Sequence, residues 1–89
     1  MEFEWDEAKN EANIVKHSLS FYEAQTVFLD KKRVVFLDKE HSTREKRYFC
    51  IGKTITGGVA TIRFTMRNDH IRIIGAGYWR KGKKIYDQD

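Results

Sequence analysis

Two predicted strands and the tight turn that joins them constrain the fold of this chain more than any other feature. Runs rich in β-branched and aromatic residues extend over Val59–Arg67 and His70–Ile74, and only Asn68-Asp69 separates them. Asparagine readily adopts the positive φ that a two-residue hairpin loop requires. The sequence therefore predicts an antiparallel hairpin. Its facing pairs are Arg67 with His70, Met66 with Ile71, Thr65 with Arg72, Phe64 with Ile73 and Arg63 with Ile74.

This register separates the side chains of the hairpin into two faces, because side chains alternate across a strand. The apolar face takes Phe64, Met66, Ile71 and Ile73. The polar face takes Arg63, Thr65, Arg67, His70 and Arg72. A shift of one residue would mix the two sets, which supports the register. The hairpin thus predicts a cationic sheet face, although a solvated sheet face also carries charge without any function.

Shorter patterns near the start of the chain predict a strand and a helix. Glu2–Trp5 alternates polar and apolar residues like a strand. Residues 6–17 are expected to form a helix that begins with a capping aspartate. Ala8, Ala12 and Val15 share one face of that helix, so we expect them to point into the core.

The middle of the chain completes an α+β pattern. Ser20 and Glu23 have the spacing of a capping box before a second helix, from Phe21 to about Leu29. Strands are predicted over residues 33–37 and 47–55, with a charged loop at 38–45 between them. The order is β-α-α-β-β-β-β with a largely antiparallel sheet, in one domain over residues 1–89. A short C-terminal helix is compatible with the pattern, although Gly82 disfavours it.

Charge is distributed unevenly along the chain. Residues 1–60 hold ten Lys/Arg and ten Asp/Glu, whereas residues 61–89 hold seven and three, so the whole net charge of +4 lies in the last third. This asymmetry is typical of proteins that bind polyanions, and aromatic rings among cations suit unpaired bases. We therefore expect binding of single-stranded RNA. The expected RNA-binding residues are Arg63, Trp79, Lys83, Lys84 and Tyr86.

The side chains available suit RNA cleavage without a metal or another cofactor. The sequence has no metal-ligand spacing and no phosphate-loop motif, and Cys50 lies in mid-strand between apolar neighbours, where we expect it to be buried and inert. RNA can be cut by its own 2′-hydroxyl if a protein accepts a proton and stabilises charge on the phosphate. His70 beside Arg67 is the best candidate for proton transfer. The same side chains also make a plain RNA-binding surface, so both hypotheses stay open.

The other histidines and the start of the chain suggest less specific roles. His17 is expected to cap or pack at a helix end. His41 is expected to be solvated in a charged loop, where a catalytic role stays open. No signal peptide follows Met1 and no apolar run reaches the length of a membrane span, which predicts a cytoplasmic protein with no membrane contact.

A series of different short motifs follows a fixed order along nearly the whole chain. They are Phe3-Glu4-Trp5-Asp6-Glu7-Ala8-Lys9-Asn10, Phe21-x-x-Ala24, Asp38-x-x-His41-Ser42, Arg47-Tyr48-x-x-Ile51-Gly52, Thr65-x-Arg67 and Ile71-Arg72-Ile73-Ile74. In this order and spacing the sequence resembles the BrnT family of bacterial type II toxins, small ribonucleases with a RelE-like fold. The resemblance implies an endoribonuclease that a BrnA-like ribbon-helix-helix antitoxin neutralises. It also implies that the complex binds operator DNA, and it leaves homo-oligomers open.

The resemblance also implies site residues. Arg67 and Arg72 would be active-site cations. Many members continue from the last strand with Ser-Ala-Arg, where this chain has Gly75-Ala76-Gly77. We therefore expect Arg80 or Lys81 to replace the missing arginine. The alternative is a degenerate toxin, which binds nucleic acid or a partner but has no catalytic activity.

Overall fold

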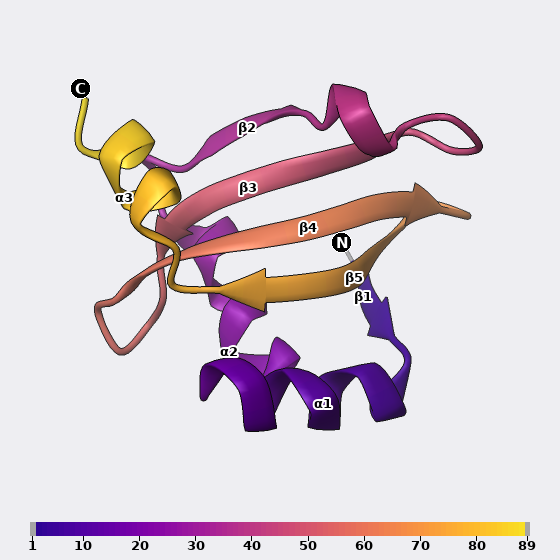
Figure 1. Ribbon diagram of the computed structural model, residues 1–89, viewed down its shortest axis with the longest axis horizontal. Helices are drawn as coiled ribbons and strands as arrows, with labels where there is room; N and C mark the ends of the chain where they lie inside the picture. Colours follow the sequence, from indigo (N-terminus) through magenta and orange to yellow (C-terminus); the bar gives the residue numbers. More distant parts are fainter. Residues whose placement is uncertain (1, 89) are drawn as a thin grey trace.

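A computed structural model describes residues 2–88 as one five-stranded sheet with helices on both of its faces (Figure 1). The strands lie in the order β1-β5-β4-β3-β2. β1 (Glu2–Trp5) is parallel to β5 (His70–Gly77). β2 (Val34–Leu37), β3 (Arg47–Lys53) and β4 (Val59–Arg67) complete an otherwise antiparallel sheet. The predicted α+β fold with a largely antiparallel sheet is confirmed.

The helices follow the predicted order with two refinements. α1 spans Glu7–His17, and α2 spans Phe21–Ala24 before it tightens into a 3-10 helix, η1, over Gln25–Leu29. The charged loop contains a second 3-10 turn, η2, at Lys39–His41. A C-terminal helix, α3, does form, over Arg80–Tyr86. Within residues 2–88 no helix has the length and apolar character that crossing a membrane requires.

Both predicted helix caps are present, although one is only half of a capping box. The Asp6 carboxylate accepts the Lys9 N–H at 3.2 Å, and the Ser20 hydroxyl oxygen accepts the Glu23 N–H at 3.0 Å. The Glu23 carboxylate does not return to Ser20. It accepts hydrogen bonds from the hydroxyls of Thr56 and Tyr78 instead, which ties α2 to the sheet.

The hairpin has the predicted register at its turn and departs from it farther along. Arg67 faces His70, and the next three pairs follow as predicted. The predicted pairing of Arg63 with Ile74 is wrong, because Arg63 faces Gly75. Ile74 is the extra residue of a bulge, which shifts the register by one and leaves Arg63 on the polar face.

The core lies between one face of the sheet, here called the inner face, and the layer formed by α1, α2 and η1. Phe21 and Val27 come from the helical layer, and Ile62, Phe64 and Ile73 come from β4 and β5. Cys50 is buried among them, and desolvation raises its pKa to about 12. The thiol is therefore protonated and unreactive at neutral pH, as the sequence predicts.

The face that α1 turns toward the core is not the predicted one. Val15 is 85% exposed, and Ala8 and Ala12 are exposed with it, so the expected apolar stripe is wrong. Asn10 and Asn13 are buried instead. Their side chains satisfy backbone groups of other segments, which small apolar side chains cannot do.

The two asparagines join α1 to three places in the chain. The Asn10 side-chain oxygen accepts the Phe21 N–H at 2.8 Å. The Asn13 amide donates to the Leu19 carbonyl at 2.9 Å, and its oxygen accepts the Ala76 N–H of β5 at 3.2 Å. These bonds fix the position of α1 through polar contacts at its buried face.

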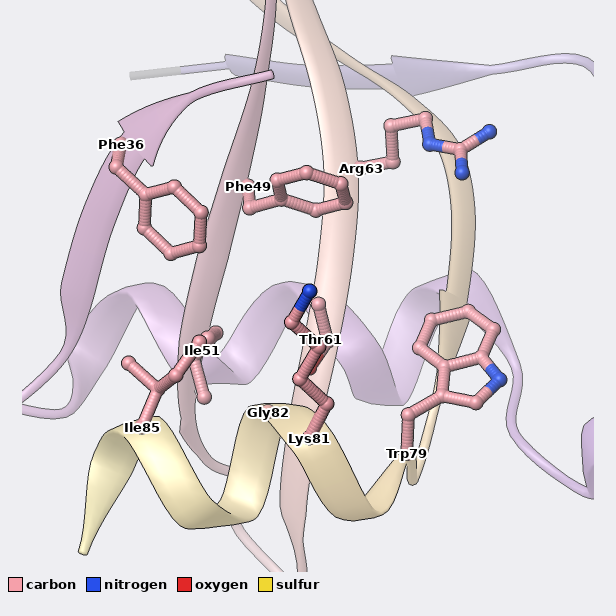
Figure 2. Close-up of a pocket in the computed structure, with 9 residues that line it drawn as sticks. All are labelled: Phe36, Phe49, Ile51, Thr61, Arg63, Trp79, Lys81, Gly82 and Ile85. Atoms are coloured by element: carbon pink, nitrogen blue, oxygen red, sulfur yellow. The ribbon is translucent and has the colours of Figure 1, made fainter. Parts of the chain in front are cut away.

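α3 packs on the opposite face of the sheet, here called the outer face, and Gly82 makes this possible. A Cβ atom at Gly82 would lie 2.0 Å from the Thr61 hydroxyl oxygen, so no other residue fits without movement. Ile85 faces Ile51 of β3 across this contact (Figure 2). The Tyr86 hydroxyl donates to the Asp30 carboxylate at 2.5 Å. The glycine that disfavours the helix in the sequence is therefore what allows the helix to dock.

Candidate functional site

The outer face of the sheet is open over most of its area, because α3 covers only the end near Thr61. The side chains of this face are the predicted polar set of the hairpin and the alternate residues of β2 and β3. Two hollows lie on it, one mainly apolar and one polar. Predicted site residues line both of them.

The apolar hollow, here called the groove, lies between α3 and strands β2, β3 and β4 (Figure 2). It has a volume of about 380 Å³. The rings of Phe36 and Phe49 lie 5.4 Å apart, and the Arg63 guanidinium carbon lies 5.8 Å from the centre of the Phe49 ring. Trp79 and Lys81 approach from the α3 side (Figure 2). The groove therefore combines aromatic surface with cations, a combination that suits an unpaired base and its phosphate.

The polar hollow lies beside the end of β4 and the charged loop. Its cations are Arg44, Arg47 and Arg67, and its acids are Glu40 and Glu45. Arg67 pairs with Glu45 at 3.2 Å, and both side chains are partly exposed. The hollow therefore offers several positive groups near one another, with one of them already balanced by a carboxylate.

Asp38 contacts one side chain from each hollow. It is 4% exposed, and its carboxylate lies 3.0 Å from Nδ1 of His41 and 3.8 Å from Nε of Arg63. His41 lines the polar hollow, whereas Arg63 lines the groove. The Arg63 Nε atom is buried and makes no hydrogen bond within residues 2–88. One buried carboxylate thus positions a side chain of each hollow.

Carboxylates of β1 pair with two further predicted site residues, His70 and Arg72. Nδ1 of His70 lies 3.0 Å from one oxygen of Glu4, and Arg72 donates to the other oxygen at 3.1 Å. Nε2 of His70 lies 3.5 Å from Glu2. Hydrogen bonds from His70 and then Arg72 lower the pKa of the Glu4 carboxyl. The parallel pairing of β1 with β5 therefore makes this end of the outer face less cationic than the sequence predicts.

A profile of known proteins matches most of the chain. It describes the ribonuclease toxin BrnT of type II toxin–antitoxin systems and covers residues 5–82. The chain belongs to the BrnT family. This match confirms the classes that the resemblance predicts for the family. They are toxin, ribonuclease and toxin–antitoxin system.

A solved structure supports the same fold for this BrnT-family chain. The crystal structure of the Brucella abortus ribonuclease toxin BrnT superposes with a TM-score of 0.67 at 23% sequence identity. The match covers 89% of this chain and 96% of that chain. A comparison with curated protein sequences gave no match.

The structure brings together only some of the predicted site residues. Arg63, Trp79 and Lys81 share the groove, and Arg67 lines the polar hollow. His70 and Arg72 lie together beside β1. The other predicted residues belong to α3, where Arg80 and Lys84 are exposed, Lys83 pairs with Asp87, and Tyr86 contacts Asp30.

Gly77, where many BrnT relatives are expected to carry arginine, makes room for Trp79. A Cβ atom at Gly77 would lie 2.7 Å from Cζ2 of Trp79. The indole also packs edge-to-face with the His17 ring, with ring centres 5.2 Å apart. His17 thus packs at the end of α1, as expected. The small residue at position 77 is therefore linked to the aromatic residue at position 79.

Sequence reasoning missed Asp38, Phe36 and Phe49, and for His41 it expected solvation and left a catalytic role open. In the sequence, Phe36 and Phe49 look like ordinary strand residues. They line a groove only because α3 packs near them in the folded chain. Asp38 and His41 do carry a local signal. Their spacing of three residues places both side chains on one side of a tight turn, as in η2.

Proposed function

We propose that this BrnT-family protein is an endoribonuclease of the bacterial cytoplasm that cuts single-stranded RNA without a metal ion. In this reaction the 2′-hydroxyl of the substrate attacks the adjacent phosphate. The observation that carries the proposal is the open outer face, on which Arg63 lines an aromatic groove and Arg67 lines a polar hollow. Guanidinium groups match phosphate oxygens, and aromatic rings stack on unpaired bases.

Each part of the outer face has a proposed role. Phe49 and Trp79 stack on a base in the groove, and Arg63 and Lys81 bind its phosphate. Arg67 stabilises the negative charge that develops on the phosphate under attack. Arg72, Arg80, Lys83 and Lys84 add positive charge along the path of the strand.

The existing ion pairs do not prevent phosphate binding. Arg67 and Glu45 are 49% and 32% exposed, so water screens their attraction. Surface ion pairs of this kind contribute about 0–1 kcal/mol. A phosphate can therefore replace the carboxylate at small cost, and the acids keep the arginines extended until RNA arrives.

We also propose that a BrnA-like ribbon-helix-helix antitoxin binds this outer face. A covering segment with acidic side chains would neutralise the free cations and exclude RNA. The ribbon-helix-helix part would hold operator DNA in the toxin–antitoxin complex. A melting curve with and without such a partner tests this, because a ligand of the folded state raises the thermal midpoint.

The test of the enzymatic proposal uses purified protein, single-stranded RNA and excess EDTA. We expect cleavage to persist and to leave 2′,3′-cyclic phosphate or 3′-phosphate ends. A substrate with a 2′-deoxy sugar at the scissile nucleotide should resist cleavage. Loss of activity in EDTA, or cutting of the deoxy substrate, would overturn the mechanism.

The second candidate function is a binding module without catalysis. The neutralisation of His70 and Arg72 by Glu2 and Glu4, together with the absence of the family arginine at Gly77, favours it. Expression in bacteria without a partner separates the two candidates. Growth arrest with loss of RNA supports the enzyme, whereas RNA binding without either effect supports the module.

A further inference from the structure

Asp38 and His41 form a pair with the geometry of a buried acid that orients a histidine base. Both carboxylate oxygens of Asp38 lie within reach of His41 Nδ1, at 3.0 and 3.2 Å. A carboxylate accepts hydrogen bonds, so Nδ1 carries the proton. In the neutral ring the other nitrogen, Nε2, is then an acceptor. It makes no hydrogen bond within the described residues 2–88.

The surroundings hold Asp38 in place and leave His41 accessible. The Asp38 N–H donates to the Arg47 carbonyl at 2.8 Å, and the Ser42 hydroxyl donates to the Asp38 carbonyl at 2.6 Å. Ser42 also accepts the Arg47 N–H at 3.0 Å. The Asp38 side chain is 5% exposed, whereas that of His41 is 48% exposed. The turn therefore holds the Asp38 carboxylate in a fixed, buried position and leaves the His41 ring open to solvent.

The polar hollow supplies what a proton acceptor at a phosphodiester needs. His41 lines it together with Arg44, Arg47 and Arg67, whose guanidinium groups suit a phosphate. Its acids are Glu40 and Glu45, and Glu45 is engaged with Arg67. A phosphate held by the arginines would bring the neighbouring 2′-hydroxyl into the same hollow as Nε2.

His70, the histidine that the sequence favours, lacks a free nitrogen. Its Nδ1 lies 3.0 Å from Glu4 and its Nε2 lies 3.5 Å from Glu2. Each ring nitrogen of His70 therefore already faces a carboxylate, and neither is free to accept a proton from a substrate hydroxyl.

From this contrast we infer that His41 is the general base of the RNA cleavage proposed above, and that Asp38 is its positioning residue. The inference rests on that proposed function. His41 Nε2 takes the proton of the 2′-hydroxyl while the 2′-oxygen forms a bond to phosphorus. The bond from phosphorus to the 5′-oxygen breaks, and the 5′-oxygen takes a proton from water. His41 returns its proton to solvent, so the products are a 2′,3′-cyclic phosphate and a 5′-hydroxyl.

The test compares kcat/KM for single-stranded RNA across native protein and variants over a range of pH. We expect H41Q to lose about 10²–10⁴-fold, the range of general-base catalysis. We expect D38N to lose less than H41Q. The fall in rate on the acid side of the native profile should be absent from H41Q. K39Q, an exposed change in the same turn, is the control and should match native protein.

Chemical rescue separates a proton acceptor from a structural residue. Imidazole added to H41A should restore part of the activity, because the exposed site admits the free base. Imidazole should not help D38N, whose histidine is still present. H41A that melts like native protein but is not rescued would assign His41 a structural role and overturn the inference.

A measurement on native protein covers the case in which a variant does not fold. Long-range ¹H–¹⁵N spectra should show the neutral His41 ring with its proton on Nδ1. A proton on Nε2 would overturn the pair whatever the activity. Active native protein with an equally active H41Q would overturn the role of His41 and leave the proposed function standing. Native protein that cuts no RNA would overturn the proposed function and this role with it.

Discussion

The inner and outer faces of the same sheet differ in what covers them. α1, α2 and η1 cover the inner face, and its side chains are almost entirely buried. One seven-residue helix, α3, covers one end of the outer face (Figure 1). It leaves aromatic rings and guanidinium groups in contact with solvent. The inner face thus provides the folding free energy, and the outer face is free to carry side chains that bind a ligand.

This division explains why buried polar atoms without a hydrogen bond lie on the outer face. The two buried polar side-chain atoms without a hydrogen bond in residues 2–88 are Thr61 Oγ1 and Arg63 Nε, and both face the groove side of the sheet. A well-packed inner layer can tolerate such costs on the other side. Variants on the two faces should therefore separate stability from RNA binding.

The largest expected effect is in the helical layer that covers the inner face. Phe21→Ala removes a fully buried ring and should cost about 3–5 kcal/mol of unfolding free energy. Phe49→Ala, on the outer face, should cost much less stability and should instead weaken RNA binding by about 1–3 kcal/mol, the range for a base stacked on an aromatic ring. Urea unfolding and RNA titration of both variants check the comparison. Equal losses of stability would show that the faces are not separated in this way.

Gly82→Ala tests the contact that joins α3 to the outer face. In a free helix this change stabilises by about 1 kcal/mol. Here the new Cβ meets Thr61, so we expect a loss of about 1–3 kcal/mol, the range for overpacking, and a change in Trp79 fluorescence. Lys84→Ala, exposed on the same helix, is the control for thermal unfolding. A more stable Gly82→Ala protein would mean that α3 does not rest on Thr61.

The charged groups of the outer face should affect cleavage more than folding. Arg67→Ala or Arg72→Ala should lower RNA cleavage at least tenfold, about 1.4 kcal/mol, while the thermal midpoint barely moves. Cleavage rates and melting curves of the same preparations check this. Arg67 is the sharper case, because it lines the polar hollow, whereas Arg72 is paired beside β1. Unfolded variants would make these residues structural.

The smallest expected effect concerns the anchor of α3. Tyr86→Phe removes the hydrogen bond to Asp30 and should cost about 1 kcal/mol. That bond raises the pKa of Tyr86 from about 10 to about 12. Because the raised pKa favours the protonated folded state, the advantage of native protein is complete below pH 10 and disappears as pH rises through 12. Unfolding curves at pH 8 and pH 12 check this, and a constant difference would contradict it.

Local sequence patterns predicted most of the fold, but they could not predict contacts between segments that are distant in the sequence. Turn residues fixed the hairpin register as far as Phe64, and capping residues marked the starts of α1 and α2. The bulge at Ile74 and the inward asparagines of α1 depend on partners elsewhere in the chain. No residue pattern in an 11-residue helix reveals that Ala76 needs an acceptor.

The candidate site was predictable in its residue types but not in its charge balance. Counting along the chain separates Glu2 and Glu4 from His70 and Arg72, and the parallel pairing of β1 with β5 then places them side by side. Asp38 was equally hidden, because its effect depends on a buried position that only the folded chain gives it. Charge counted in sequence is therefore a poor guide to the charge of one sheet face.

The hydrogen bond from Ala76 to Asn13 also bears on self-association. β5 has eight residues, but among residues 2–88 β1 pairs only with His70–Ile73, so the rest of that sheet edge has no neighbouring strand in this part of the chain. An open edge invites strands of other molecules to add to it. Asn13 occupies one of these backbone donors, and α1 lies beside the edge. The Asn13 side chain thus takes the place of a backbone acceptor beyond the end of β1. Asn13→Ala should therefore make the protein more prone to aggregate.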